Sequence, residues 1–324
     1  MLRESIMAQY LVLSFYLLEP IANPDFEVKR FHRFFADKDI KGRIYISREG
    51  VNAQMSVREE EAPLFYDWLA ADPRFAAVDI KVQMYDGHAF PKMTVKYRKQ
   101  LVALDCEIDL SLRGDYLSPK EWAEKLDQRN AETLVLDVRN DYEWDVGHFE
   151  GAKRPACKTF REFPVTVERI KAQYDREKTQ IMMSCTGGIR CELYSCLLKR
   201  QGFKHVYQLK GGVINYGLEV GTKHWKGELF VFDDRLVVPL STNQKSTVIG
   251  KCSICTAKTR AYYNCANMDC NQLFLSCSTC IQKQRGCCSK ECIEAPRRRK
   301  FVFQSCPKPF KKLSFEEKTK YCEP

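Results

Sequence analysis

A short loop around Cys185 offers a nucleophile. The segment 183–192 places this cysteine on a glycine-containing turn between an apolar strand and a predicted helix. Because the N–H groups of such a loop point inward and the helix adds the positive end of its dipole, a thiolate there is stabilised. The pKa of the thiol should therefore fall, and Arg190 can close the rim over the anion. The predicted active-site loop consists of Cys185, Thr186, Gly187, Gly188, Ile189 and Arg190.

The length of this loop indicates the chemistry that it suits. A related cradle for tetrahedral phosphate is one residue longer, whereas this loop fits a cysteine that carries one extra sulfur or a similarly small group. Sulfur or redox chemistry is therefore favoured over phosphate chemistry. Cys191 follows at the helix start, where a resolving thiol and a small packing residue fit the sequence equally well. Asp137, Arg139 and His148 are predicted to be structural rather than catalytic.

The C-terminal quarter of the chain offers metal ligands. It holds cysteines in short pairs, and two such pairs complete a tetrahedral Zn²⁺ shell. We expect two structural zinc ions, because this segment has few large apolar residues and needs metal in place of a core. Iron–sulfur ligation is the competing interpretation, and spacing does not show which pairs share an ion. The predicted ligands are Cys252, Cys255, Cys265, Cys270, Cys277, Cys280, Cys287, Cys288 and Cys292.

Composition places the protein in a reducing compartment. The chain has 324 residues, 44% of them hydrophobic, which suits two or three folded domains. Sixteen cysteines without an export signal argue for thiols and metal thiolates, and residues 8–18 are too few to span a membrane. We therefore expect a cytoplasmic protein that makes no use of the membrane. Its oligomeric state is left open.

Positive charge gathers at the same C-terminal end. Residues 251–324 carry 15 Lys and Arg against 6 Asp and Glu, which is nearly all of the net charge of +10. A basic end on an otherwise neutral protein indicates a polyanionic partner such as RNA, although a solvated tail would look the same. Basic residues alternate here with aromatic rings, as in proteins that grip phosphates and stack on unpaired bases. The predicted RNA contacts are Arg297, Arg298, Arg299, Lys300, Lys311 and Lys312.

Hydrophobic periodicity predicts the secondary structure that positions these sites. Residues 10–82 follow the order βαββαβ, with helices over 26–35 and 59–71 and a last strand over 78–82, which fits a ferredoxin-like layer of helices on an antiparallel sheet. Residues 90–110 are predicted to be a linker with extended pieces. A capping box at Ser118-Pro119-Lys120-Glu121 begins a second domain, in which strands and helices alternate as in a parallel α/β sheet.

The motifs of this second domain resemble the rhodanese family. They are residues 137–143, residues 147–152, the cysteine loop and Leu209-Lys210-Gly211-Gly212, in that family's order. A closer resemblance, to the bacterial tRNA wobble-uridine hydroxylases, lies in residues 185–192, 160–164, 49–52 and 230–235. Together with the periodicity and the cysteine pairs, it gives a prediction of three parts: a ferredoxin-like (acylphosphatase-like) α+β domain with linker over 1–112, a rhodanese domain over 113–240, and a cysteine-rich basic zinc-binding region over 241–324.

The same resemblance implies an activity. It is an oxygen-dependent hydroxylation that forms 5-hydroxyuridine at the wobble position, uridine 34, with the tRNA anticodon loop as partner, molecular oxygen as co-substrate and Cys185 required. Arg190 and Cys191 are the other two predicted catalytic residues. Two alternatives stay open: a sulfurtransferase that carries a persulfide on Cys185, and a non-enzymatic zinc-stabilised adaptor that binds nucleic acid.

Overall fold

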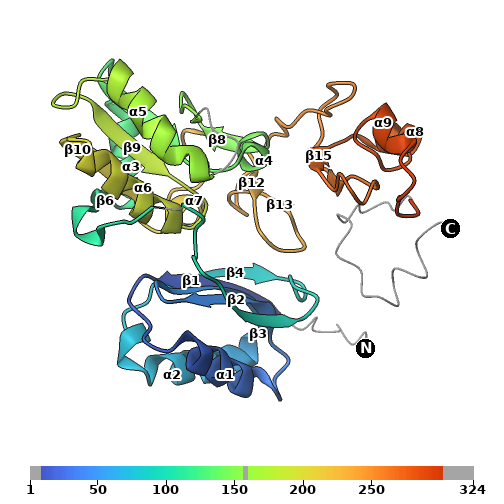
Figure 1. The fold of residues 1–324 in the computed structure, drawn as a ribbon, viewed down its shortest axis with the longest axis horizontal. Helices are drawn as coiled ribbons and strands as arrows, with labels where there is room; N and C mark the ends of the chain where they lie inside the picture. The colour runs from blue at the N-terminus through green and yellow to red at the C-terminus, as the bar shows by residue number, and fades with distance from the viewer. Residues whose placement is uncertain (1–8, 105, 156–159, 302–324) are drawn as a thin grey trace, which may run out of the picture. The chain divides into compact units, whose positions relative to one another are not determined.

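The structure divides into two compact units. It is a computed structural model, and it describes residues 9–104, 106–155 and 160–301 (Figure 1). Unit 1 contains Met1–Val138, Pro155–Val220 and Asp233–Arg235, and unit 2 contains Arg139–Arg154, Gly221–Phe232 and Leu236–Pro324.

The first part of unit 1 is a five-stranded sheet with helices on one face. The sequence order βαββαβ is confirmed, and the strands lie in the order β4-β1-β3-β2-β5. The fifth strand runs parallel to β2 within the stretch that was expected to be a linker. The elements are β1 (Tyr10–Leu17), α1 (Pro24–Phe35), β2 (Lys41–Ser47), β3 (Gly50–Arg58), a 3-10 turn (Glu59–Glu61), α2 (Ala62–Ala70), a 3-10 turn (Pro73–Phe75), β4 (Lys81–Tyr85) and β5 (Met93–Tyr97).

Period-two burial gives this sheet its two faces. Leu13, Ile44, Val51 and Met55 are fully buried under α1 and α2. Most residues that point to the other face are polar and only partly buried, namely Ser14, Arg43, Asn52 and Gln54, whereas Val12 on that face is buried with Ala89 and Phe90. Figure 1 shows both helices on the same side of the sheet. The face that lies opposite α1 and α2 is therefore mostly polar.

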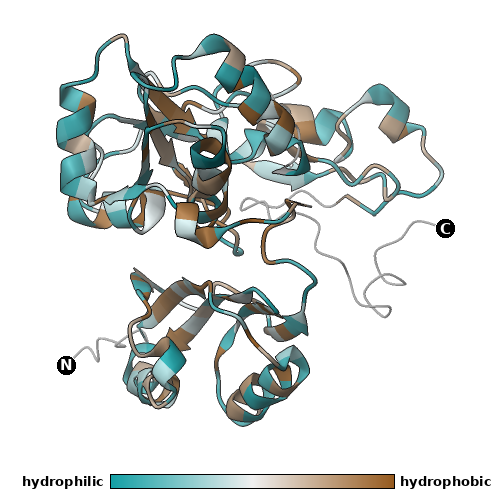
Figure 2. Cartoon of the chain, turned by 60° about the vertical axis from the view of Figure 1, so that its left-hand side comes forward, coloured by the Kyte–Doolittle hydropathy of each residue, from teal (hydrophilic) through white to brown (hydrophobic). Residues whose placement is uncertain are grey.

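The second part of unit 1 is a parallel sheet in the order β6-β10-β9-β7. The middle residues of two of its strands, Leu134–Leu136 and Ile181–Met183, are apolar and buried, and brown strand ribbons are visible in this part of Figure 2. Such apolar runs are typical of a sheet covered on both faces. The α/β architecture expected for this region is thus confirmed. The elements are a 3-10 turn (Leu110–Leu112), β6 (Asp115–Leu117), α3 (Pro119–Asp127), β7 (Thr133–Asp137), a 3-10 turn (Phe160–Glu162), α5 (Phe163–Gln173), β9 (Gln180–Ser184), α6 (Ile189–Arg200), β10 (His205–Leu209) and α7 (Gly212–Glu219).

Unit 2 has short strands and a cysteine-rich segment. The stretch 147–152, expected to be rich in turns, begins with a strand that pairs with β11. The elements are α4 (Asp141–Trp144), β8 (Gly147–Phe149), β11 (Trp225–Gly227), β12 (Leu229–Phe230), β13 (Val237–Val238), β14 (Tyr262–Asn264), β15 (Leu273–Leu275), α8 (Ser278–Lys283) and α9 (Lys290–Ile293). Among the described residues of the whole chain, no helix combines the length and the apolar character needed to cross a bilayer.

Several boundaries in unit 1 differ from their predictions: α1 begins at Pro24 instead of residue 26, and the helix expected over 59–71 is an α-helix only over Ala62–Ala70, after a 3-10 turn. The strand expected over 78–82 begins at Lys81 and continues to Tyr85, because its register is set by pairing with β1, where Leu13 lies opposite Val82. By contrast, the capping box at α3 is present: the Glu121 N–H donates to Ser118 Oγ at 3.3 Å, and the Ser118 N–H donates to Glu121 Oε2 at 2.8 Å.

This cap yields a stability prediction. Replacing Ser118 with alanine should lower the free energy of unfolding by about 1 kcal/mol, because the first turn of α3 loses its side-chain acceptor. Urea unfolding of the full chain measures the change. Ser118→Thr keeps the acceptor and is the control, and equal stability of the alanine and threonine variants would contradict the assignment.

Candidate active site and metal centres

Cys185 stands at the carboxyl end of β9, the edge at which open α/β sheets place their chemistry. The loop after it enters α6 through Gly188, which serves as the N-cap residue with a φ of 105°. Side chains rarely adopt this conformation, and a Cβ on Gly188 would lie 2.8 Å from the Tyr16 hydroxyl. Glycine is therefore required at the point where the loop turns into the helix.

The loop surrounds the Cys185 sulfur with hydrogen-bond donors. The Gly188 N–H donates to Sγ at 3.1 Å. Burial by itself would raise the pKa of this thiol, but hydrogen bonds from the Cys191 side chain and backbone, together with the charge of Arg190, lower the pKa to about 6. At neutral pH the sulfur is then mostly a thiolate, the form that acts as a nucleophile.

Cys191 supports this thiolate as a hydrogen-bond donor. Its side chain is fully buried, and burial together with the hydrogen bond to Cys185 raises the pKa of its thiol well above the usual value. A thiol that keeps its proton donates to the neighbouring sulfur. The sequence left a resolving thiol and a small packing residue open for this position, and the structure adds a third role, in which Cys191 donates a hydrogen bond to Cys185.

Arg190 is held inside the loop that it closes. Its guanidinium is buried and donates from Nη2 to the Thr186 hydroxyl at 3.3 Å. The positive charge lowers the pKa of Cys185. Arg190 therefore acts on the sulfur through its charge.

The two glycines before α7 pack directly against the loop. The Val213 N–H donates to the Cys185 carbonyl at 2.9 Å, and the Ile214 N–H donates to the Thr186 carbonyl at 3.1 Å. A Cβ on Gly212, whose φ is 70°, would lie 2.6 Å from the Cys185 carbonyl oxygen. The Gly-Gly pair, noted in the sequence only through the family resemblance, lets α7 fix the outer side of the loop.

The Glu192 carboxylate has three polar partners that were not predicted from the sequence. Its carboxylate accepts from the Tyr16 hydroxyl at 2.8 Å and from the Tyr116 hydroxyl at 2.8 Å, and the Arg113 Nε lies 3.5 Å away. Burial and the charge of Glu192 raise the pKa of Tyr16, and they raise that of Tyr116 to about 12. Both tyrosines therefore stay protonated and hold the carboxylate at the start of α6.

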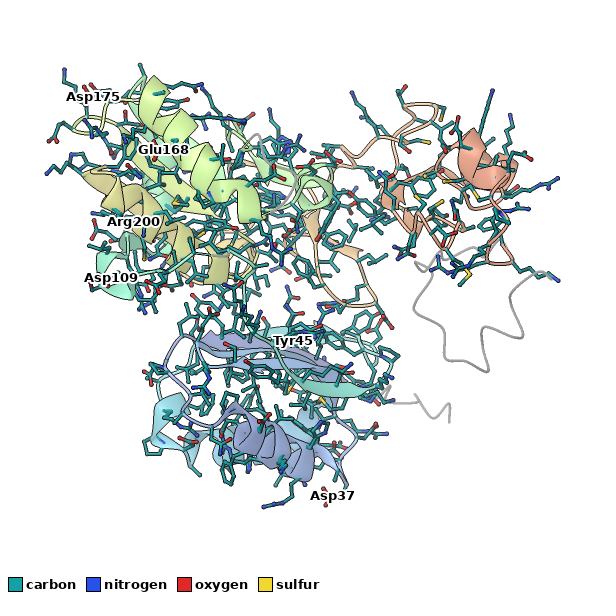
Figure 3. All side chains as sticks on the ribbon, viewed as in Figure 1. Asp37, Tyr45, Asp109, Glu168, Asp175 and Arg200 are labelled. Carbon is teal, nitrogen blue, oxygen red and sulfur yellow. The ribbon has the colours of Figure 1, made fainter. Side chains whose placement is uncertain are left out.

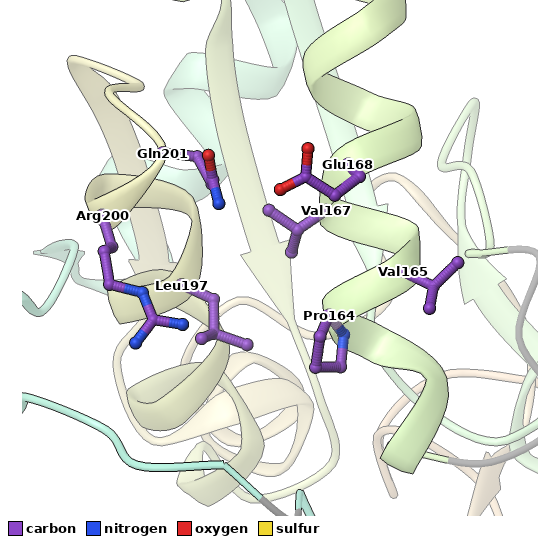
Figure 4. A pocket seen from close by; sticks show the side chains of 7 residues that line it. All are labelled: Pro164, Val165, Val167, Glu168, Leu197, Arg200 and Gln201. Carbon is purple, nitrogen blue, oxygen red and sulfur yellow. The ribbon is translucent and has the colours of Figure 1, made fainter.

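Access to Cys185 is closed in this structure. The side chain has 0% exposure. It lines neither the pocket of about 320 Å³ between α5 and α6, shown in Figure 4, nor the larger pocket of about 940 Å³ that includes Leu18, Lys99 and Leu193. A substrate therefore reaches the sulfur only when part of its surroundings moves.

Residues predicted to be structural have structural contacts. Asp137 is buried at the end of β7. In unit 2, Arg139 donates to the Gly147 carbonyl and lies 5.1 Å from the Trp225 ring. His148 stacks on Trp144, with Nδ1 3.1 Å from the Trp144 carbonyl oxygen.

The cysteines of unit 2 form two groups of four. Within each group the sulfurs lie within 4.8 Å of one another, as a tetrahedral metal shell requires. The groups interleave along the chain, since the first and third pairs make one group and the second and fourth pairs make the other. The groups are Cys252, Cys255, Cys277 and Cys280, and Cys265, Cys270, Cys288 and Cys292.

Cys287 is the one predicted ligand that belongs to neither group. It is buried, and its Sγ donates to the Cys292 carbonyl at 3.3 Å. The neighbouring Cys288 points its sulfur into the second group instead. Four thiolates form a closed shell, so the donor set fits a structural Zn²⁺ at each group and leaves no open position for catalysis.

The predicted RNA contacts near these groups are partly engaged in the fold. Arg299 donates to the Cys265 carbonyl at 2.8 Å, Arg297 pairs with Asp269 at 2.7 Å, and Arg298 donates to the Ala295 carbonyl at 3.0 Å. Arg299 thus fixes the backbone of a metal-group cysteine. Lys300 is exposed, and Lys311 and Lys312 lie outside the described residues.

The fold and the cysteine loop together define a rhodanese-domain protein. The profile of the rhodanese-like domain matches residues 118–218, that of the rhodanese C-terminal region matches residues 226–293, and that of the UPF0176 acylphosphatase-like domain matches residues 10–101. The solution structure of a rhodanese-like domain from Anabaena is 21% identical, covering 35% of this chain and 78% of that one with a TM-score of 0.29.

Curated relatives define the family more narrowly. The tRNA uridine(34) hydroxylase of Protochlamydia amoebophila is 52% identical over 303 residues, which cover 94% of each chain. The tRNA uridine(34) hydroxylase of Chlamydia muridarum is 50% identical over 304 residues, which cover 94% of this chain and 92% of that one. The chain therefore belongs to the tRNA uridine(34) hydroxylase family.

The cradle around Cys185 yields a prediction about its ionisation. Thiolate absorbance, taken as the difference between the wild type and Cys185→Ala, should rise with pH through a midpoint near 6. Cys191→Ala should move the midpoint upward, because the sulfur loses a donor. Cys196→Ala is the matched control, since the Cys196 thiol donates to the Glu192 carbonyl rather than to Cys185. A wild-type midpoint at the ordinary thiol value of about 8.5 would contradict the cradle.

The two cysteine groups yield a prediction about metal content. Elemental analysis of freshly purified protein should find two zinc ions per chain. Cys288→Ser should lose one of them, whereas the adjacent substitution Cys287→Ser should keep both. Loss of zinc from both variants alike, or a wild type without zinc, would overturn the assignment of the groups.

Proposed function

We propose that this protein hydroxylates uridine 34 of tRNA to 5-hydroxyuridine in the cytoplasm, with the Cys185 thiolate as the reacting group of the chain. The observation that carries the proposal is the buried sulfur with a lowered pKa inside its loop, found in a chain about half identical to two tRNA uridine(34) hydroxylases. A nucleophile of this kind suits a ring carbon that a neutral thiol would not attack.

The substrate must leave its stack to be modified. The C5 carbon of a stacked anticodon base is out of reach of a buried side chain, so the uridine is extruded from the loop before it meets Cys185. The sulfur is fully buried, so the water that would otherwise solvate the thiolate is excluded.

Two uses of the thiolate remain as alternatives within this proposal. In the first, the sulfur adds to C6 of the uracil ring, which makes C5 electron-rich and ready for oxidation; loss of the C5 proton then expels the sulfur. In the second, the sulfur itself carries a sulfenic or peroxidic oxygen to the ring. Replacement of C5–H by C5–OH removes two electrons from the uridine. Molecular oxygen is the proposed oxidant: it takes up these two electrons and leaves as hydrogen peroxide, with one water balancing the atoms (uridine + O₂ + H₂O gives 5-hydroxyuridine + H₂O₂).

Other residues of the site have supporting roles in the proposal. Arg190 and Cys191 keep the sulfur ionised. The Gly188 N–H holds the sulfur in place by donating a hydrogen bond to it. The two zinc ions would fold the cysteine-rich segment of unit 2, where tRNA contacts are proposed for Arg297, Arg298, Lys300, Lys311 and Lys312.

Nucleoside analysis tests this function. Mass spectrometry of tRNA from cells that lack the protein should show a loss of 5-hydroxyuridine and its derivatives. The wild-type chain should restore the modified nucleosides, whereas Cys185→Ala should not; Cys196→Ala, a change at another buried thiol, should restore them. Unchanged nucleosides would reject the hydroxylase. Thiosulfate-to-cyanide sulfur transfer that depends on Cys185 would then support the sulfurtransferase, and full rescue by Cys185→Ala would support the adaptor.

A further inference from the structure

The face of the β1 to β5 sheet that lies opposite α1 and α2 has an unusual composition. Strand pairing places Tyr16, Asn52, Tyr45 and Lys96 in one row across β1, β3, β2 and β5. A second row, two residues along each strand, consists of Ser14, Gln54, Arg43 and Thr94. Facing residues in such rows are direct neighbours, so these side chains form one continuous surface.

No carboxylate stands in these two rows, whereas both contain a basic residue. Arg98 follows Lys96 two residues along the chain and adds a third cation, with its N–H bonded to the Ile46 carbonyl at the end of β2. Lys96 and Arg98 are exposed, and among the described residues neither has an acidic side chain within ion-pair distance. The surface is therefore positively charged and accessible at its β5 edge.

An aromatic ring lies among these basic side chains. Tyr45 projects from the sheet on the side away from α1 and α2 (Figure 3). The Arg98 guanidinium lies 4.6 Å from the centre of its ring, and that of Arg43 lies 5.7 Å away. Aromatic rings and guanidinium planes are the groups on which proteins stack unpaired bases, and the cations beside them suit phosphates.

We propose that this surface, named here the Tyr45 platform and formed by Arg43, Tyr45, Asn52, Gln54, Lys96 and Arg98, binds the single-stranded loop of the RNA substrate. Tyr45 and Arg98 stack on an unpaired base, Lys96 and Arg43 contact phosphates, and the two amides bond to base edges. This inference rests on the proposed function for the identity of the RNA, but not for the binding itself.

One row of side chains connects the platform to the helix that follows the reactive loop. Asn52 lies between Tyr45 and Tyr16 in the first row, and the Tyr16 hydroxyl donates to Glu192 in the first turn of α6. A nucleotide held at Tyr45 is thus connected, through one row of side chains, to the helix whose N-terminal loop holds Cys185.

The test is a binding measurement on the full zinc-containing chain with Cys185→Ala, so that no reaction occurs. The probe is a fluorescent RNA hairpin with the length of an anticodon stem-loop and a uridine at its wobble position. Tyr45→Ala should raise the Kd about tenfold, because base stacking is lost. Tyr45→Phe keeps the ring and should stay within about twofold of the parent.

A matched charge pair separates the platform from general electrostatics. Lys96→Ala with Arg98→Ala should weaken binding at least tenfold and reduce the slope of log Kd against log salt by about one. Lys29→Ala with Arg33→Ala removes the same charge from exposed positions of α1, on the helical side of the sheet, and should leave both quantities nearly unchanged.

Three results would overturn the platform. They are equal weakening by the two charge pairs, unchanged binding of Tyr45→Ala, and loss of dimers in light scattering upon Tyr45→Ala without loss of RNA binding, which would make the face a contact between copies. Failure of the hydroxylase proposal is a separate result, since it appears in the nucleosides of Cys185 variants and leaves these affinities untouched.

Discussion

The rest of the site depends on keeping a thiolate stable without water. Cys185 is fully buried, and burial alone would return its proton. The Gly188 and Cys191 N–H groups, the Cys191 thiol and the Arg190 charge supply what solvent would have supplied. These donors all come from the segment 185–191, so the local conformation of that segment decides whether the sulfur is ionised.

This conformation is fixed from outside the loop. The amides of α7 hold two loop carbonyls, and this contact needs a glycine at position 212. On the other side, Tyr16 and Tyr116 secure Glu192 in the first turn of α6. Because Tyr16 also ends the row of the N-terminal sheet that contains Tyr45, the surface proposed to bind RNA adjoins the side chain that orders the reactive helix.

The sequence predicted what local pattern and spacing determine. The cysteine loop follows from a strand, two glycines and a helix in succession, and the cap of α3 follows from four consecutive residues. Contacts between distant segments were not predictable: β5 pairs with β2 about fifty residues earlier, and Tyr16 meets Glu192 at a separation of 176 residues. The interleaved pairing of the cysteine groups, and the exclusion of Cys287 next to Cys288, depend likewise on the folded chain.

The pH dependence of hydroxylation tests the central claim most directly. With purified protein and tRNA, kcat/KM should rise with pH through an apparent pKa near 6, and Cys191→Ala should shift that rise to higher pH while Cys196→Ala does not. A rate that follows an ordinary thiol pKa of about 8.5, or one whose pH profile is the same with and without the Cys191 thiol, would contradict the account.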